Sequence, residues 1–255
     1  MDLELAGKAF IITGGTEGLG LALAEALIRE GARVAVCGRR AEKVASAQAM
    51  LGDAGVAVQA DVTIASELDA FYDRALQTFG RIDGVVNNAG RSAATPLANS
   101  TDDEWREDFE LKVMSAVHLT RRAIPQLIEH RGAVLNILAI KGKSPDAGST
   151  PTAASRAAGL ALTKALAGEL APQGVRVNAI LIGLIKSGQW TRRADAMSMN
   201  HDDLYDAIVE NQKIPLGRMG EATEFADLAT YLLSSRASYL TGVGINLDGG
   251  LSPLP

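Results

Sequence analysis

The chain reads Lys-Ala-Phe-Ile-Ile-Thr over residues 8–13 and continues Gly-Gly-Thr-Glu-Gly-Leu-Gly over residues 14–20. The first run is short, apolar and rich in β-branched residues, which is typical of a buried strand, and the pattern over 18–30 is helical. Glycines at such a junction let the backbone approach a pyrophosphate, whose charge lies at the positive end of the helix dipole. The stretch therefore predicts a phosphate-binding loop. The competing interpretation is that these glycines only turn a strand into a helix.

The same alternation of strand and helix runs through the rest of the chain. Strand patterns occur over 33–38, 56–61, 84–90, 133–140, 176–182 and 244–250, and helical patterns over 41–51, 66–79, 101–129 and 152–170. Such alternation specifies βαβ units with right-handed crossovers, which build a parallel sheet. We therefore predict an α/β fold with a doubly wound, seven-stranded parallel sheet and helices on both faces.

Composition favours one domain, residues 1–255, that acts on a small molecule. The 255 residues are 47% hydrophobic, enough for a single core, and the net charge of −5 argues against nucleic acid or an anionic membrane as partner. Cys37 is the only cysteine, and the first ten residues lack the pattern of a secretion signal. No apolar run approaches the roughly 20 residues of a membrane span. We expect a cytoplasmic location and predict no metal site.

The segment 186–213 carries no strand signal. It contains Trp190, Met197, Met199 and Tyr205. Such a segment suits a mobile lid beside a site.

The motifs, in their order, resemble those of the short-chain dehydrogenase/reductase family. The first is the Gly-x-x-x-Gly-x-Gly spacing over 14–20. The others are Asp-Val at 61–62, Asn-Asn-Ala-Gly at 87–90, Val-Arg-Val-Asn-Ala at 175–179 and Asp-Gly-Gly at 248–250. The resemblance covers nearly the whole chain, and it implies a Rossmann-type fold that binds a nicotinamide dinucleotide.

The resemblance also implies which residues hold the cofactor. In the glycine loop these are Gly14, Thr16, Glu17, Gly18, Leu19 and Gly20. Asp61, with Val62, would bind the adenine amine, and Asn88, Ala89 and Gly90 would pass beside the nicotinamide ribose. Ile185 and Ser187 would flank the nicotinamide. Gly183 would leave room for the ring, although Ile182 replaces the proline that the family has before it.

The end of the second strand favours NADP(H) over NAD(H). Gly38 stands where an acidic residue would bond the ribose hydroxyls and repel a 2′-phosphate, and Arg39 and Arg40 follow it. A guanidinium can bind a phosphate with two parallel hydrogen bonds. Glu17 is a counterweight, since many NADP-dependent relatives carry a basic residue there. The competing interpretation is that the two arginines form a solvated basic turn.

The resemblance breaks at the catalytic positions. The family works with an Asn-Ser-Tyr-Lys set, and the corresponding positions here hold Lys112, Ala139, Thr152 and Arg156. A threonine hydroxyl ionises far above neutral pH and arginine is effectively never deprotonated, so neither is a credible general base. Proton transfer by a positioned group is typically worth about 10²- to 10⁴-fold in rate. An ordinary alcohol or ketone should therefore react poorly.

The replacements still point to chemistry. Lys112 and Arg156 are predicted on adjacent helices, and the resemblance lets Arg156 bind the nicotinamide ribose. A desolvated Lys112 beside a fixed cation would have a lowered pKa and act as a proton donor or as a clamp on an anionic substrate. The competing interpretation is that Lys112 fills the asparagine space and bonds backbone carbonyls. His201 or Tyr205 could supply the proton only if the lid closes over the ring.

These observations give one leading hypothesis and two alternatives. The leading one is an NADP(H)-dependent oxidoreductase with a non-standard proton source, in which Lys112, Thr152 and Arg156 are the catalytic candidates. Its substrate would be a small molecule such as an iminium, an activated C=C compound or an anionic carbonyl. The alternatives are a nucleotide-binding pseudoenzyme, acting as sensor or partner subunit, and a non-redox activity such as a carbon–carbon lyase.

The alanine-rich helix over 152–170 bears on assembly. The family resemblance implies a homotetramer, or a homodimer, formed through the long helices. The competing account is that these alanines are buried within the monomer.

Overall fold

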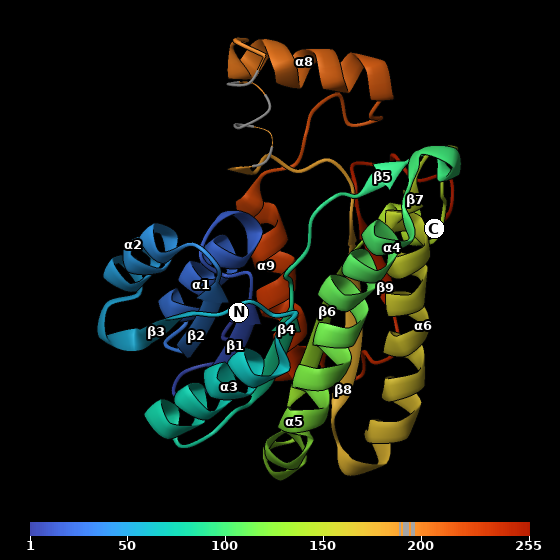
Figure 1. Cartoon of the computed structure of the whole chain (residues 1–255). Coiled ribbons are helices and arrows are strands. Elements are labelled where there is room, and N and C mark those ends of the chain that lie inside the picture. Colours follow the sequence, from blue (N-terminus) through green and yellow to red (C-terminus); the bar gives the residue numbers. More distant parts are fainter. Residues whose placement is uncertain (189, 191–193, 195–196) are drawn as a thin grey trace.

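The computed structural model describes residues 1–255 except 189, 191–193 and 195–196. A parallel sheet has the strand order β3-β2-β1-β4-β6-β8-β9 (Figure 1). Its strands are β1 Ala9–Thr13, β2 Arg33–Gly38, β3 Gly55–Gln59, β4 Gly84–Asn87, β6 Ala133–Ala139, β8 Arg176–Ile182 and β9 Gly244–Leu247. The predicted seven-stranded, doubly wound sheet is confirmed. β9 ends before the pattern predicted because Gly249 and Gly250 turn the chain, with φ of 64° and 85°.

Helices cover both faces of this sheet because its strands are apolar on both sides. In β1, Phe10 and Ile12 pack into one core cluster, while Ile11 packs into the other. The first cluster lies under α1 Gly18–Arg29, α2 Ala41–Leu51 and α9 Ala222–Leu233. The second lies under α3 Ala65–Phe79, α5 Ser115–His130 and α6 Thr152–Leu170.

The long helix predicted over 101–129 is interrupted. α4 Asp102–Phe109 leads into a π-helical turn, Glu110–Met114, and α5 follows at once. Thr101 and Glu104 form a capping box that fixes where α4 begins. Single π-helical turns inside α-helices occur frequently at functional sites. This one carries Lys112.

A small ladder lies outside the main sheet. β5 Ala94–Thr95 pairs antiparallel with β7 Thr150–Pro151, and α6 begins at the next residue. The ladder therefore brings the backbone before β5 next to the first turn of α6.

The expected lid contains a helix, α8 His201–Gln212, which Figure 1 shows at the top, set apart from the sheet. Part of the expected lid, at 189, 191–193 and 195–196, lies outside the described residues. Among the helices that the structure describes, none combines the length and the apolar character needed to cross a membrane.

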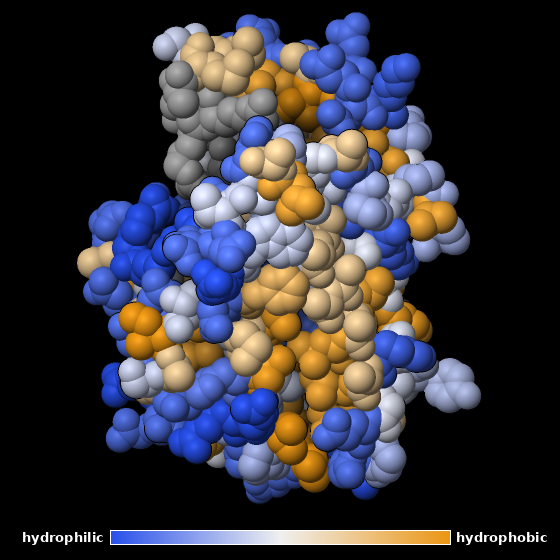
Figure 2. All heavy atoms as spheres, turned by 45° about the vertical axis from the view of Figure 1, so that its right-hand side comes forward, coloured by the Kyte–Doolittle hydropathy of each residue, from blue (hydrophilic) through white to orange (hydrophobic). Residues whose placement is uncertain are grey.

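α6 presents small side chains to the surface. Ala157, Ala161 and Ala165 are exposed along one side of the helix, and the neighbouring π turn and α5 expose Met114 and Ile128. Figure 2 shows hydrophobic surface on the side of the molecule where α5 and α6 lie. The account in which the helix alanines are buried within the monomer is therefore wrong for this stripe.

Candidate active site

A cavity of about 950 Å³ lies at the carboxyl ends of the central strands. The last residues of β2, β6 and β8, which are Gly38, Ala139 and Ile182, all line it. Open α/β sheets bind their ligands at this edge, where the strand order reverses. The volume stands at the upper end of the roughly 300–1,000 Å³ typical of ligand sites. The cavity therefore has room for a large ligand.

The cavity brings together nearly all of the residues that the family resemblance marked. Its lining includes Gly14, Thr16, Glu17, Gly18, Leu19, Arg39, Arg40, Asp61, Val62, Asn88, Ala89, Gly90, Thr152, Arg156, Gly183, Ile185 and Ser187. Two of the marked residues, Gly20 and Lys112, are not part of the lining. That any of these residues contacts a cofactor stays a prediction.

The glycine loop has the shape of a ligand cradle at Gly18. This residue has a φ of 58°, and among the residues that the structure describes a Cβ placed on it would have only Ser187 Cβ nearby, at 3.9 Å. Both residues line the cavity, so a side chain at Gly18 would project into it. The loop thus fits the close approach of a phosphate to the backbone.

Two other glycines serve packing instead. A Cβ on Gly20 would lie 2.6 Å from Asn88 Nδ2, which donates hydrogen bonds to the carbonyl oxygens of Thr13 (2.9 Å) and Gly14 (3.0 Å). Gly20 therefore makes room for the amide that fastens the loop. A Cβ on Gly183 would lie 2.6 Å from Asp248 Cβ. Gly183 is therefore required for packing against Asp248, and because it also lines the cavity, its expected place beside the nicotinamide ring stays a prediction.

At the other end of the cavity, the two arginines have different partners. Arg40 Nη2 lies 2.6 Å from Glu17 Oε2, and Arg39 Nη1 lies 3.7 Å from Asp61 Oδ2. The Arg39 side chain is 64% exposed, and exposed ion pairs contribute only about 0–1 kcal/mol, so a ligand could recruit it readily. The negative charge of Glu17, which in the sequence argued against NADP(H), forms an ion pair with Arg40.

The Thr152 hydroxyl is held at the wall of the cavity. Its Oγ1 accepts hydrogen bonds from the backbone N–H of Ala93 (2.8 Å) and from Lys112 Nζ (3.1 Å). A hydroxyl has two acceptor lone pairs and one proton to donate. Both lone pairs are taken, so the proton is the part of the hydroxyl that remains for a partner in the cavity. In the sequence Thr152 is a catalytic candidate without a credible role as a general base, and the β5–β7 ladder gives its hydroxyl this geometry.

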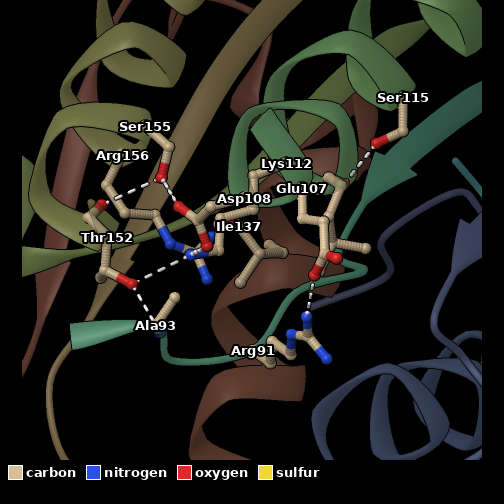
Figure 3. A network of polar contacts seen from close by, with 11 residues as sticks. Arg91, Ala93, Glu107, Asp108, Lys112, Ser115, Ile137, Thr152, Ser155 and Arg156 are labelled. Carbon is tan, nitrogen blue, oxygen red and sulfur yellow. Dashed lines mark hydrogen bonds and ion pairs between the residues drawn. The ribbon is translucent and has the colours of Figure 1, made fainter. Parts of the chain in front are cut away.

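Lys112 does not line the cavity; it contacts Thr152 from the protein interior and forms an ion pair with Asp108 (Figure 3). Both side chains are 1% exposed. Asp108 Oδ2 also accepts a hydrogen bond from Ser155 Oγ (2.6 Å) on α6. The lysine bonds side chains, so the interpretation in which it bonds backbone carbonyls is wrong. A direct clamp on an anionic substrate is wrong as well, because the amine does not line the large cavity.

The surroundings of Lys112 favour release of its proton. Burial, and after it the charge of Arg156, lower the pKa of the lysine to about 8, while Asp108 acts in the opposite direction. Arg156 donates from Nη1 to the carbonyl oxygen of Ile137 (2.6 Å), and desolvation lowers the pKa of its guanidinium to about 10. At neutral pH both groups are therefore cations, and Lys112 is the one closer to losing its proton.

The remaining proton candidates of the sequence are not in the cavity lining. Neither His201 nor Tyr205 lines it, and Lys186 Nζ lies over the Tyr205 ring, 5.3 Å from the centroid. The residues that sequence reasoning missed are Asp108 and Ser155. The available signal was spacing, because Asp108 stands four positions before Lys112, the separation of ion-paired neighbours on a helix.

Comparison with known proteins identifies the family. The family model described as enoyl-(acyl carrier protein) reductase matches residues 14–252. A 3-oxoacyl-[acyl-carrier-protein] reductase of Haemophilus influenzae is 31% identical over 96% of this chain and 98% of its own length.

Solved structures agree with this match. A short-chain oxidoreductase of Pseudomonas aeruginosa PAO1, solved with NADPH and described as containing an atypical catalytic centre, is 36% identical. Its TM-score is 0.91, over 97% of this chain and 98% of that one. L-sorbose reductase of Gluconobacter frateurii, in complex with NADPH and L-sorbose, is 28% identical with a TM-score of 0.95, and each chain is fully covered. With the sheet order, the glycine loop and the cavity, these matches show that the chain belongs to the short-chain dehydrogenase/reductase family of oxidoreductases, which bind a nicotinamide cofactor.

Proposed function

We propose that this protein is an NADP(H)-dependent oxidoreductase in which Lys112, acting through Thr152, supplies the proton that a small substrate takes up on reduction. The proposal rests on the position of the Thr152 hydroxyl at the cavity wall. Its oxygen accepts two hydrogen bonds, so its own proton remains available for donation to a substrate. Ala139 offers no hydroxyl at the family's serine position. Of the four positions that hold the family's catalytic set, Thr152 is therefore the one that still carries a hydroxyl.

The proton follows a short route in this proposal. A bound nicotinamide dinucleotide supplies the hydride. Thr152 donates its proton to the substrate oxygen that gains negative charge, and Lys112 returns a proton to Thr152 Oγ1 across their 3.1 Å hydrogen bond. The balance is one hydride and one proton, which convert a C=O group to an alcohol. Threonine is here a relay, so its own high pKa sets no limit, and the acid is Lys112 with a pKa near 8.

This geometry favours a carbonyl over an iminium among the substrate classes that the sequence left open. An iminium becomes a neutral amine on gaining a hydride and needs no proton donor, whereas a carbonyl becomes an alkoxide. A positioned O–H group is suited to developing negative charge. The experiment is oxidation of NADPH across a panel of ketones, aldehydes, imines and enones. Binding of NADPH without oxidation by any of them would favour the pseudoenzyme.

Gly38 supports the choice of NADP(H). A Cβ at this position would lie 2.3 Å from Thr16 Oγ1, so an aspartate or glutamate that excludes a 2′-phosphate cannot be accommodated without displacing the Thr16 side chain. Arg39 and Arg40 stand beside it in the cavity lining. We assign the 2′-phosphate to Arg39 first, because Arg40 is already paired with Glu17 at 2.6 Å.

Arg39→Ala is expected to weaken NADPH binding by roughly 10- to 100-fold and to leave NADH binding nearly unchanged. The reason is the loss of charge-assisted hydrogen bonds to the phosphate, each worth about 1.5–3 kcal/mol. Nucleotide fluorescence titration measures both affinities, and Arg74→Ala, an exposed arginine on α3, is the control. Equal affinities for NADPH and NADH, unchanged by Arg39→Ala, would remove the assignment.

Gly18→Val is expected to abolish dinucleotide binding, because the side chain would occupy the phosphate's place in the cavity. Valine at this positive φ also strains the backbone, so the control substitution must replace a glycine with a similar φ. Gly52→Val is matched: Gly52 has a φ of 54°, open space around its Cβ position, and a place at the end of α2 outside the cavity. Calorimetry gives the affinities and circular dichroism the folded state. A folded Gly18→Val protein with undiminished binding would place the nucleotide elsewhere.

We also propose the assembly and the lid that the sequence suggested. The exposed stripe of Ala157, Ala161 and Ala165 suits close approach of a second copy, in a homodimer or homotetramer. For the lid at 186–213, the support is that Trp190 and Ile208 line the cavity. One domain over 1–255 and a cytoplasmic location complete the proposal.

A further inference from the structure

We propose that Asp108 is a positioning residue of the active site, whose buried carboxylate holds the Lys112 ammonium group against the Thr152 hydroxyl. The inference rests on the proposed function for the role of Lys112. It adds a residue that does not line the cavity.

The carboxylate is fixed from two sides. Its Oδ1 pairs with Lys112 Nζ, and its Oδ2 accepts the hydrogen bond from Ser155 Oγ at 2.6 Å (Figure 3). Ser155 lies on α6, three residues after Thr152, and is 1% exposed. One helix therefore carries both the group that anchors the carboxylate and the hydroxyl that the lysine must reach. This arrangement sets the place of Lys112 Nζ relative to Thr152 Oγ1.

Asp108 differs in burial from the other acids of α4. Its side chain is 1% exposed, whereas those of Asp102 and Asp103 are 91% and 86% exposed. Burying a carboxylate is costly unless it is paired and hydrogen-bonded. Here both conditions are met, and the partners are the lysine of the proton route and a residue of the same helix as Thr152.

The charges around Lys112 come from three elements. Asp108 on α4 supplies the negative charge, while Arg156 on α6 and Arg91, in the loop after β4, supply positive charge. Burial and the two arginines favour the neutral amine, and the carboxylate favours the ammonium ion. Without Asp108, the charged groups that act on Lys112 in the described part of the chain would be the cations Arg156 and Arg91. The lysine would lose its proton at a lower pH and also its tether toward Thr152.

The proposal is tested by the titration of Lys112 itself. Nuclear magnetic resonance on protein with isotope-labelled lysine follows the side chain, and Lys112→Met assigns its signal. In wild-type protein the midpoint should lie near pH 8. Asp108→Asn should lower the midpoint by about 1–3 units, the usual effect of one opposite charge at short range. Asp108→Ser, which removes the carboxylate with a smaller side chain, should lower it likewise if Asp108→Asn folds poorly.

Asp103→Asn is the control, because it neutralises an exposed carboxylate on the same helix. The midpoint of the Lys112 titration in this variant should equal that in the wild-type protein. An unchanged midpoint in Asp108→Asn and Asp108→Ser would overturn the inference, whatever their turnover.

Activity separates this inference from the proposed function. If both hold, reduction by Asp108→Asn at pH 7 falls about 2- to 100-fold, the loss of protonated Lys112 that a midpoint lowered by about 1–3 units produces, and recovers as the pH is lowered, since acid restores the proton to Lys112. A purely structural defect would not recover in acid. The third outcome is a lowered titration midpoint of Lys112 with a pH dependence of turnover that stays unchanged. In that case Asp108 does set the pKa of Lys112, and only the proposed role of Lys112 as proton source is wrong.

Discussion

Lys112→Met is expected to reduce NADPH-dependent reduction of a carbonyl substrate by about 10²- to 10⁴-fold at pH 7, while NADPH affinity stays nearly constant. The magnitude is that of general acid catalysis by a positioned group. Affinity is spared because the lysine does not line the cavity. Steady-state turnover and nucleotide titration measure the two effects, with Lys164→Met, an exposed lysine on α6, as the control.

Variants of Thr152 test the same proton route. Thr152→Val removes the relay and should be about as slow as Lys112→Met, whereas Thr152→Ser keeps the hydroxyl and should retain most activity. Because the two groups act in series, the double variant should be no slower than either single one. Independent, multiplying losses in the double variant would show that Lys112 and Thr152 do not share a proton route.

Asp108→Leu is expected to lower the free energy of unfolding by about 3–5 kcal/mol at neutral pH, because it leaves the buried Lys112 ammonium without its partner. Adding Lys112→Met should restore most of this loss, since an apolar pair of similar size replaces the ion pair. Urea denaturation gives all four free energies of the cycle.

The exposed ion pair on the same helix provides the control for this cycle. Arg106 Nη1 lies 2.7 Å from Asp103 Oδ1, and the two side chains are 67% and 86% exposed. Asp103→Leu should therefore change the free energy of unfolding by only about 0–1 kcal/mol. Strictly additive losses for Asp108→Leu and Lys112→Met would mean that the two buried side chains are not coupled.

The sheet could be predicted because its signal is repeated. Each strand run is apolar and is followed by a helical pattern, so the order of elements alone specifies βαβ units. The π-helical turn at Glu110–Met114 could not be predicted in this way, since its residues continue an ordinary helical pattern. β5 and β7 are two residues long, too short to leave any periodicity.

The same limits explain the site. The cavity-lining residues follow strand ends, so motif and topology place them together. Asp108 is one of several acids in the run Asp-Asp-Glu-Trp-Arg-Glu-Asp-Phe, and apart from its four-residue spacing to Lys112 only its burial distinguishes it from Asp103. The part played by Thr152 depends on the N–H of Ala93, distant in sequence and brought near by the β5–β7 ladder. Tertiary contacts of this kind have no local sequence signal.

The most direct test of the Lys112–Thr152 proton route is the pH dependence of kcat/KM for NADPH oxidation, with whichever carbonyl compound the substrate panel identifies. A donor must hold its proton, so kcat/KM for reduction should be constant below the pKa of Lys112, about 8, and should fall about tenfold per pH unit above it. In Lys112→Met this alkaline limb should be absent. The same limb at the same midpoint in Lys112→Met would contradict the assignment of Lys112 as the proton source.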